Sequence, residues 1–407
     1  MKLKLYVDRM SQPSRALIIF CKVNRIDYEE IRVDIAKRQH RSPDFQEINP
    51  MKQVPAIVDG RFKLFESHAI LIYLACAFPG VSDHWYPADL SKRAKIHSVL
   101  DWHHSNLRRG AAAFVLNTVL APALGLPLNP QAAAEAEKIL TQSLSTMETV
   151  WLKGSGKFLL GSNQPSIADL SLACEIMQLE LLDEKDRSRI FGPHKKVQQW
   201  IDDTKNATRP HFDQVHEIIF KFKTRLQKQQ SRDGETDPSV KALQSKMVNG
   251  IKYEEITVDL TKHQQKSPAY IAVAVVLQTK LAPLIGQPLN PAAAAKAEKL
   301  LISALSKVES IWLDGNNGGF LLGNDQPSIA DLSLVCEIME LEVLDDEHRN
   351  RILGPYKKVQ KWIDNTRNAT SPYFHEVHQL LFQIKESMQN NQSEDASDSK
   401  KDLYSKM

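Results

Sequence analysis

The sequence predicts a small α/β domain followed by an all-α helical bundle and then by a second, partial all-α bundle. Three observations support this prediction. Strand-like and helix-like patterns alternate over residues 1–80, whereas residues 90–228 are almost entirely helical in pattern. The run QPSIADLSL occurs at both 164–172 and 326–334, inside a longer stretch of similarity, and a repeat of this length indicates a duplicated structural unit.

The first 80 residues alternate between the two kinds of element. Asp59-Gly60, between two short apolar runs, is a strong signal for a tight hairpin. Strand, helix and strand followed by a hairpin and a helix make a small mixed sheet with helices on its faces. The expected strands cover 3–7, 28–34, 54–58 and 61–64, and the expected helices cover 16–23 and 67–78.

The following region reads as a helical bundle. Apolar residues recur at helical spacing over 132–151. Ser166 and Asp169 have the spacing of a capping box, in which the hydroxyl caps the helix start and the carboxylate reaches back. An apolar helix is expected from there over 170–182. Further helices are expected over 193–206 and 211–228.

The remaining chain is a linker, a partial repeat and a tail. The linker and tail are polar and nearly free of large apolar residues. The repeat restarts at Asn249 with a counterpart of the second strand, but it has no counterpart of residues 1–23 or 44–110. A strand without its sheet cannot pair its backbone groups, so we expect 248–268 to be loosely held or to adopt a non-sheet conformation. The predicted segments are 229–248 (linker), 249–388 (partial repeat) and 389–407 (tail).

Composition narrows the classes of partner. A formal net charge of +3 over 407 residues predicts neither a nucleic acid nor a membrane as partner. No apolar run approaches the ~20 residues of a membrane helix, and the first residues lack a signal peptide pattern. The cysteines form no CxxC pair, so we expect buried thiols in a reducing compartment; they are Cys21, Cys76, Cys174 and Cys336.

Several short motifs follow the predicted strands in a specific order. They are Ser11-Gln12-Pro13-Ser14-Arg15, Gln39-His40, Asn49-Pro50, Gln53-Val54-Pro55, Glu66-Ser67 with Ala69-Ile70, and Ser166–Asp169. With these motifs in this order, residues 1–230 resemble a complete, plant-like glutathione transferase of the theta class. The resemblance implies a thioredoxin-like, glutathione-binding domain over 1–80 and a helical domain over 90–228. It also implies glutathione as co-substrate, with no cofactor and no metal.

The resemblance assigns Ser11 as the catalytic residue. A free thiol has a pKa of ~8.5, and only the thiolate is a competent nucleophile. Ser11 precedes a helix that begins near Pro13, so its hydroxyl can donate to the glutathione sulfur while the helix N-terminus adds positive potential. The alternative is that Ser11 only caps the helix.

The same resemblance implies the glutathione-binding residues. Val54 would pair, strand-like, with the cysteinyl unit after a cis-proline turn, while Glu66 and Ser67 would hold the γ-glutamyl end. His40, with Arg41 or Lys52, would face the glycyl carboxylate. Each has a plainer interpretation: a strand-start proline, a helix cap at Ser67 and a solvated loop histidine. The full set is Gln12, His40, Arg41, Lys52, Gln53, Val54, Pro55, Glu66 and Ser67.

Arg108 matches an arginine that lies near the second-substrate pocket in this class, and its alternative is a surface helix arginine. His103 and His104 are adjacent on a predicted helix and point about 100° apart, so we predict no metal site there. The second substrate implied by the resemblance is a hydrophobic electrophile or a hydroperoxide, and the family also implies a homodimer.

Two functions from different classes fit these residues. The first is a transferase whose glutathione thiolate attacks electrophiles or reduces organic hydroperoxides. The second is a non-catalytic ligand-carrying or interaction protein, because a fold alone does not fix a function. The partial repeat lacks counterparts of Ser11, Val54-Pro55 and Glu66-Ser67, so we predict one active site per chain.

The last three residues carry a targeting signal. Ser405-Lys406-Met407 resembles the Ser-Lys-Leu peroxisomal address, which is read at a free C-terminus. Ser245-Lys246-Met247 closes the first copy identically, but an internal tripeptide is unreadable. We therefore predict a peroxisomal location, with cytosol and nucleus as alternative or additional locations.

Overall fold

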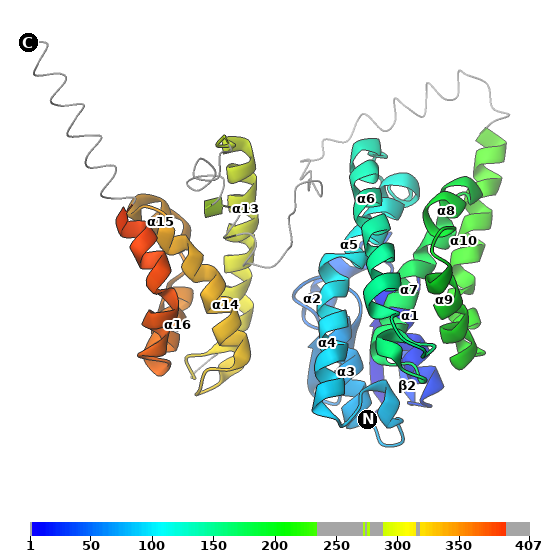
Figure 1. Ribbon diagram of the computed structural model, residues 1–407, viewed down its shortest axis with the longest axis horizontal. Coiled ribbons are helices and arrows are strands. Elements are labelled where there is room, and N and C mark those ends of the chain that lie inside the picture. Colours follow the sequence, from blue (N-terminus) through cyan, green and yellow to red (C-terminus); the bar gives the residue numbers. More distant parts are fainter. Residues whose placement is uncertain (1, 234–271, 273–274, 277–287, 315–317, 388–407) are drawn as a thin grey trace, which may run out of the picture. The chain divides into compact units, whose positions relative to one another are not determined.

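The computed structural model describes residues 2–233, 272, 275–276, 288–314 and 318–387 (Figure 1). The chain divides into two compact units, residues 1–261 and 262–407, called unit 1 and unit 2 below. The predicted linker beyond residue 233, the predicted loose strand within 248–268 and the tail lie outside the described residues.

Unit 1 begins with a four-stranded sheet and its helices, and continues with a helical bundle. The first part contains β1 (Leu3–Val7), α1 (Gln12–Val23), β2 (Tyr28–Arg32), η1 (Gln39–Arg41), α2 (Pro43–Gln46), β3 (Ala56–Asp59), β4 (Phe62–Phe65) and α3 (Ser67–Ala77). The second part contains α4 (Leu90–Ser105), α5 (Leu107–Val115), α6 (Pro130–Thr146), α7 (Ile167–Ile176), η7 (Met177–Leu181), α8 (Glu184–Phe191), α9 (Lys195–Ala207) and α10 (His211–Asp233).

The sheet has the strand order β2-β1-β3-β4, with β1 parallel to β2 and β3 antiparallel to both of its neighbours. The buried residues of β1 alternate as predicted. The hairpin differs by one position from the expectation. Because the register pairs Asp59 with Phe62, the loop consists of Gly60 and Arg61, and Gly60 adopts the positive φ of 62° that such a turn needs.

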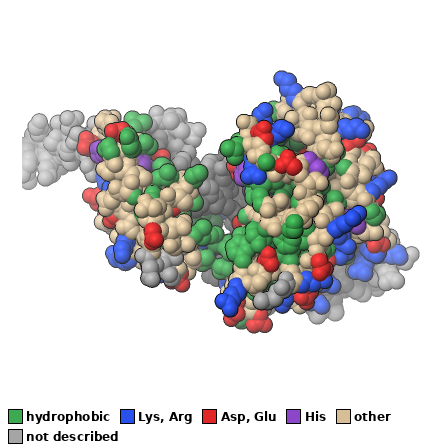
Figure 2. All heavy atoms as spheres, turned by 90° about the horizontal axis from the view of Figure 1, so that it is seen from below, with side chains coloured by type: hydrophobic (Ala, Val, Ile, Leu, Met, Phe, Trp, Pro, Cys, Tyr) green, Lys and Arg blue, Asp and Glu red, His purple; other side chains and the backbone are tan. Residues whose placement is uncertain are grey.

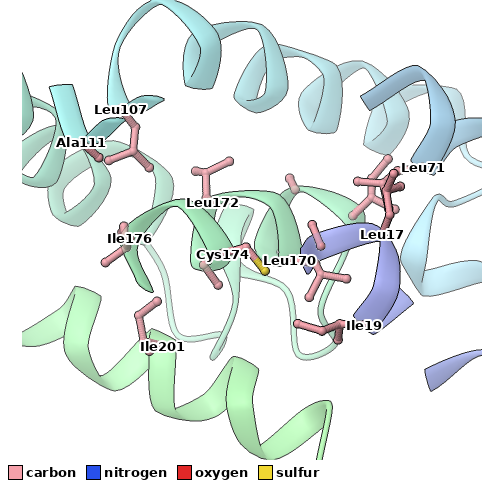
Figure 3. Close-up of a cluster of buried hydrophobic side chains, with 14 of the residues drawn as sticks. Leu17, Ile19, Leu71, Leu107, Ala111, Leu170, Leu172, Cys174, Ile176 and Ile201 are labelled. Atoms are coloured by element: carbon pink, nitrogen blue, oxygen red, sulfur yellow. The ribbon is translucent and has the colours of Figure 1, made fainter. Parts of the chain in front are cut away.

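The sheet domain and the bundle of unit 1 share one hydrophobic core. Helix α1 packs against α3, α7 and α10, so it joins the two parts. Figure 3 shows Leu17 from α1, Leu71 from α3 and Leu170 from α7 in the same cluster. A shared core fixes the sheet edge, where α1 begins, relative to the bundle.

The predicted capping box at the start of α7 is confirmed. Ser166 caps the helix, and its N–H donates to Asp169 Oδ2 at 2.8 Å. The other carboxylate oxygen accepts from Leu159 N–H and from Trp200 Nε1–H, both at 2.8 Å. One buried carboxylate therefore holds a loop, a helix start and α9 together, and each of its bonds is charge-assisted.

Unit 2 repeats this arrangement in its own core. Asp331 accepts from Leu321 N–H at 2.8 Å and from Trp362 Nε1–H at 2.7 Å, and Ser328 N–H donates to its second oxygen at 2.8 Å. The described elements include α13 (Pro291–Lys307), η10 (Val308–Trp312), η11 (Leu321–Gly323), α14 (Ile329–Met339), η12 (Glu340–Val343), α15 (Asp346–Leu353), α16 (Lys357–Ala369) and a helix over residues 373–387.

Two further observations complete the fold. Cys21 and Cys174 are buried as predicted, but Cys76 and Cys336 are exposed, so the expectation of buried thiols is wrong for these two. Among the described residues, no helix is both long and apolar enough to cross a membrane.

Candidate active site

The sheet register brings the predicted site segments to one edge of the sheet. Tyr6 near the end of β1 pairs with Ala56 at the start of β3, and Ala56 pairs with Phe65 at the end of β4. Val7 pairs with Arg32, the last residue of β2. The segments that carry Ser11, Val54, Glu66 and His40 all leave or enter the sheet at this edge.

Ser11 lies between β1 and α1 and is buried, with 9% of its surface exposed. It occupies the N-cap position of α1, but its side chain makes no capping hydrogen bond. Its backbone is held instead, because its N–H donates to Asp8 O at 2.9 Å and its carbonyl accepts from Arg15 N at 3.1 Å. The hydroxyl is thus left available for a ligand, which argues against a purely capping role.

The loop before Ser11 is braced by Arg15, which the sequence analysis named within the first motif without giving it a role. Its guanidinium is fully buried and donates to Arg9 O at 3.1 Å and to Met10 O at 3.0 Å. It also donates to Cys174 O at 3.0 Å and to Gln178 Oε1 at 2.8 Å. Burial lowers the pKa of Arg15 to about 10, so the group is still charged at neutral pH.

A carboxylate braces the same loop from the other side. Asp8 Oδ1 accepts from Met10 N–H at 2.9 Å, and Oδ2 accepts from Ile35 N–H at 2.9 Å. Asp8 therefore ties the loop that carries Ser11 to the segment that follows β2 and leads to η1. For Arg15, the available sequence signal was a basic residue directly before the apolar run 16–23.

His40 lies in η1 and is half-buried. Its Nδ1 is buried and has no hydrogen-bond partner among the described residues. Burial lowers the pKa of His40 below its ordinary value, and the neighbouring Arg41 lowers it further. An unpaired buried imidazole nitrogen costs free energy unless a ligand or water satisfies it, which supports a binding role over that of a solvated loop histidine.

The turn before β3 is fixed by a buried asparagine. Asn49 donates through Nδ2 to Gln53 O at 2.6 Å and accepts from Met51 N–H at 2.9 Å. The Val54-Pro55 peptide bond is cis, as the resemblance implied. Strand pairing begins only at Ala56, so Val54 takes no part in the sheet register and its backbone faces no neighbouring strand. Lys52 is exposed on the same turn.

The start of α3 differs in one respect from the expectation. The N-cap is Glu66, and Ser67 is the first helical residue, so the interpretation of Ser67 as N-cap is wrong. Glu66 has φ 70° and ψ 110°, a conformation that costs a non-glycine residue on the order of 1–3 kcal/mol. Such backbone strain clusters at ligand-binding turns, and the first N–H groups of α3 have no helical acceptor.

Arg108 of α5 belongs to a polar cluster that sequence reasoning missed. Its Nη1 donates to Glu175 Oε2 at 2.7 Å, and Glu175 is buried in α7. His103 Nε2 lies 3.5 Å from the same oxygen, and its Nδ1 lies 3.3 Å from Nε2 of His68, the residue after Ser67. Arg108 is therefore more than a surface arginine, because it neutralises a buried carboxylate.

The charges within this cluster are strongly coupled. Burial opposes ionisation of Glu175, but Arg108 and His103 together keep its pKa below the ordinary value. Burial holds the pKa of His68 well below its ordinary value, and the neighbouring His103, His104 and Arg108 add to the effect. No local sequence pattern indicated these contacts, because the histidines and the glutamate lie in different predicted helices. No group of three or more His, Cys, Asp or Glu in the described part of the chain is placed to hold a metal.

Comparison with protein families identifies the class. Residues 1–76 match the glutathione S-transferase N-terminal domain and residues 130–203 match the C-terminal domain. Glutathione S-transferase T1 of Arabidopsis thaliana is 70% identical over 247 residues, which are 61% of this chain and 100% of that protein. Glutathione S-transferase T2 of the same plant is 67% identical over 61% of this chain and 43% of its own length. The chain belongs to the glutathione S-transferase family.

Within that family the chain belongs to the theta class. Human glutathione S-transferase theta-1 is 38% identical over 55% of this chain and 91% of its own length. A crystal structure of human glutathione transferase theta-2, in complex with glutathione and an unknown ligand, has 31% identity and a TM-score of 0.51. It covers 61% of this chain and 100% of that one. The N-terminal sheet domain is thioredoxin-like, and these transferases use glutathione as co-substrate without a cofactor.

Proposed function

We propose that unit 1 conjugates glutathione to hydrophobic electrophiles and reduces organic hydroperoxides, with one active site per chain at the sheet edge. The observation that carries this proposal is the buried Ser11 hydroxyl, which caps nothing and lies on the same edge as Val54 and Glu66. The complex of the human theta-2 relative with glutathione supports the choice of ligand.

In the proposed mechanism Ser11 donates its hydroxyl hydrogen to the glutathione sulfur. This hydrogen bond and the N-terminus of α1 favour the thiolate and lower the thiol pKa. Val54 pairs with the cysteinyl backbone, Glu66 and Ser67 hold the γ-glutamyl end, and His40 faces the glycyl carboxylate. Gln12, Arg41, Lys52 and Gln53 lie on the same segments and complete the proposed binding set.

Conjugation and peroxide reduction start from the same thiolate. In conjugation the sulfur forms a bond to the electrophilic carbon, and the leaving group departs with the bonding electron pair. In peroxide reduction the sulfur attacks the terminal oxygen of the hydroperoxide, which gives an alcohol and a glutathione sulfenic acid. A second glutathione displaces water from the sulfenic acid to give the disulfide. Arg108, whose guanidinium is oriented by Glu175, lies at the second-substrate side in this proposal.

The test is a comparison of Ser11→Ala with Ser14→Ala. Ser14 is a matched control, because it lies on the same helix, is buried and has a hydroxyl with no hydrogen-bond partner among the described residues. We expect Ser11→Ala to lower kcat on the order of 10²-fold with little change in glutathione affinity, since it removes a donor that acts on developing charge. Equal turnover in the two variants would overturn the assignment.

The alternative is a non-catalytic carrier or interaction protein. It predicts that residues 1–230 and the full chain bind a glutathione column without transferase or peroxidase turnover. Activity in the short form alone would instead indicate that unit 2 masks the site.

We further propose that unit 2 is a partial second copy of the bundle and that the chain is a homodimer located in peroxisomes. The paired capping boxes and the repeated QPSIADLSL run support the duplication. The location rests on Ser405-Lys406-Met407, and removing these residues from a fluorescently tagged chain should move it to the cytosol. Light scattering of the full chain tests the dimer.

A further inference from the structure

Four polar side chains from four helices of unit 1 form one continuous series of contacts. His68, in the first turn of α3, has its Nε2 3.3 Å from Nδ1 of His103 in α4. Nε2 of His103 lies 3.5 Å from Oε2 of Glu175 in α7, and Arg108 of α5 donates to this same oxygen at 2.7 Å. The series begins one residue after Ser67, at the proposed glutathione site, and ends at the proposed second-substrate site.

The middle of this series is buried, whereas its Arg108 end is open. His68 is 9% exposed, His103 is 4% exposed and Glu175 is 1% exposed. The side chain of Arg108 is 36% exposed. Charged side chains of both signs lie at the surface in Figure 2, and a glutamate buried this deeply is rare unless it is paired. A ligand beside Arg108 can therefore reach one end of the series without entering the core.

The helices that carry these side chains are packed together. Helices α3, α4 and α5 all pack against α7. Figure 3 shows Leu71 of α3, Leu107 of α5 and Leu172 of α7 in the same apolar cluster. Because a close-packed core transmits small displacements between its elements, a shift in the first turn of α3 is passed on to α4 and α7.

The contact between His103 and Glu175 is the weakest step of the series. At 3.5 Å it is longer than a charge-assisted hydrogen bond, which measures about 2.7–2.9 Å. Nε2 of His103 and Oε1 of Glu175 are both buried and have no hydrogen-bond partner among the described residues. An unpaired buried polar atom costs free energy, so a small movement that closes this contact is favourable.

The direction of the closed hydrogen bond follows from the charge of Glu175. Burial opposes ionisation of Glu175, but Arg108 and His103 keep the pKa of this carboxyl below its ordinary value. The ionised carboxylate can only accept, so Nε2 of His103 must carry the hydrogen. His103 is therefore the donor that can connect the two ends of the series.

We propose that His103 is a positioning residue that couples the glutathione site to the second-substrate site by closing its contact with Glu175 when ligands bind. Glutathione at the first N–H groups of α3 fixes His68, and a substrate beside Arg108 fixes Glu175. Each ligand thereby orders one end of the series, and the second ligand binds to a contact that is already formed. This inference rests on the two binding sites of the proposed function, but it does not require turnover.

The test measures binding of two ligands to the full chain by isothermal titration calorimetry. The probes are glutathione and cumyl alcohol, the unreactive alcohol formed when cumene hydroperoxide is reduced. Cumyl alcohol should tighten glutathione binding about fivefold, and glutathione should tighten cumyl alcohol binding by the same factor, because coupling between two ligands is reciprocal.

Variants of His103 should change this coupling factor. His103→Leu removes both ring nitrogens and should abolish the factor, whereas His103→Gln keeps a donor and an acceptor and should retain part of it. His97→Leu is the matched control, because His97 lies on the same helix and its loss removes one hydrogen bond, to Tyr86 at 2.8 Å, outside the series. Glu175→Gln keeps the side-chain volume and should lower the same factor, which provides the test if circular dichroism shows that His103→Leu does not fold.

Three results would overturn the proposal. They are no mutual tightening in the unchanged chain, an unchanged factor in both His103→Leu and Glu175→Gln, and an equal loss of the factor in His97→Leu. Turnover without mutual tightening would refute the coupling and leave the proposed function in place. Mutual tightening without transferase or peroxidase turnover would support the coupling and refute the proposed activity.

Discussion

Replacing Arg15 by methionine should both destabilise unit 1 and impair its catalysis. Methionine keeps most of the side-chain volume in the core but removes the donors to Arg9 O, Met10 O, Cys174 O and Gln178 Oε1. A buried acceptor that loses its donor costs about 1–3 kcal/mol, although removing a buried charge returns part of this. We therefore expect unfolding free energy to fall by about 2–4 kcal/mol, measured by urea denaturation of residues 1–230.

Catalysis should change because Arg15 binds the backbone carbonyls of the loop that positions Ser11. A looser loop weakens the hydrogen bond to the sulfur, so the thiol pKa of bound glutathione should rise and the pH profile of kcat should move upward. Arg9→Met is the control: Arg9 pairs with Glu30 at 2.7 Å near the surface, and such pairs are worth at most about 1 kcal/mol. A loss in Arg15→Met no larger than in Arg9→Met, with an unchanged pH profile, would refute this reasoning.

Three more changes test other parts of the structure. Burial holds the pKa of His68 and of His216 well below the ordinary value, so the unfolded chain takes up protons first as pH falls. Stability is therefore lost below pH ~6.5, by up to about 2 kcal/mol per group at pH 5. The difference between the urea midpoints at pH 7 and pH 5 should be smaller in His216→Gln than in the unchanged chain, and an equal difference would contradict the assignment to His216. Asp331→Ala should lower the melting temperature of unit 2, because it removes the hydrogen bonds from Leu321, Ser328 and Trp362. Transferase activity should stay intact, and its loss would contradict the assignment of the active site to unit 1 alone. Glu175→Gln should leave Arg108 with a neutral partner and raise KM for the second substrate more than KM for glutathione. Equal changes in both constants would count against a role of Arg108 at the second-substrate pocket.

Patterns with a fixed spacing were predictable from the sequence, whereas contacts between distant elements were not. The capping box of Ser166 and Asp169 depends on residues three apart, so the sequence determines it directly. The hairpin was misplaced by one residue because Asp59-Gly60 is a strong turn signal on its own, while the register that makes Gly60-Arg61 the loop is set by pairing with β1. The contact between Arg108 and Glu175 joins α5 to α7, and no local pattern encodes it.

The two copies of QPSIADLSL separate two kinds of information within one short sequence. The polar residues act on their own helix and its immediate neighbours, so Asp169 and Asp331 make the same bonds in both units. The apolar residues only specify that some surface must cover them, and Ile167 and Ile329 show that the same residue is buried or bare according to what the rest of the chain supplies. Burying an exposed aliphatic side chain stabilises the buried state by about 1.5–3 kcal/mol. Exposed apolar residues on one helix face therefore favour the binding of a surface that covers them.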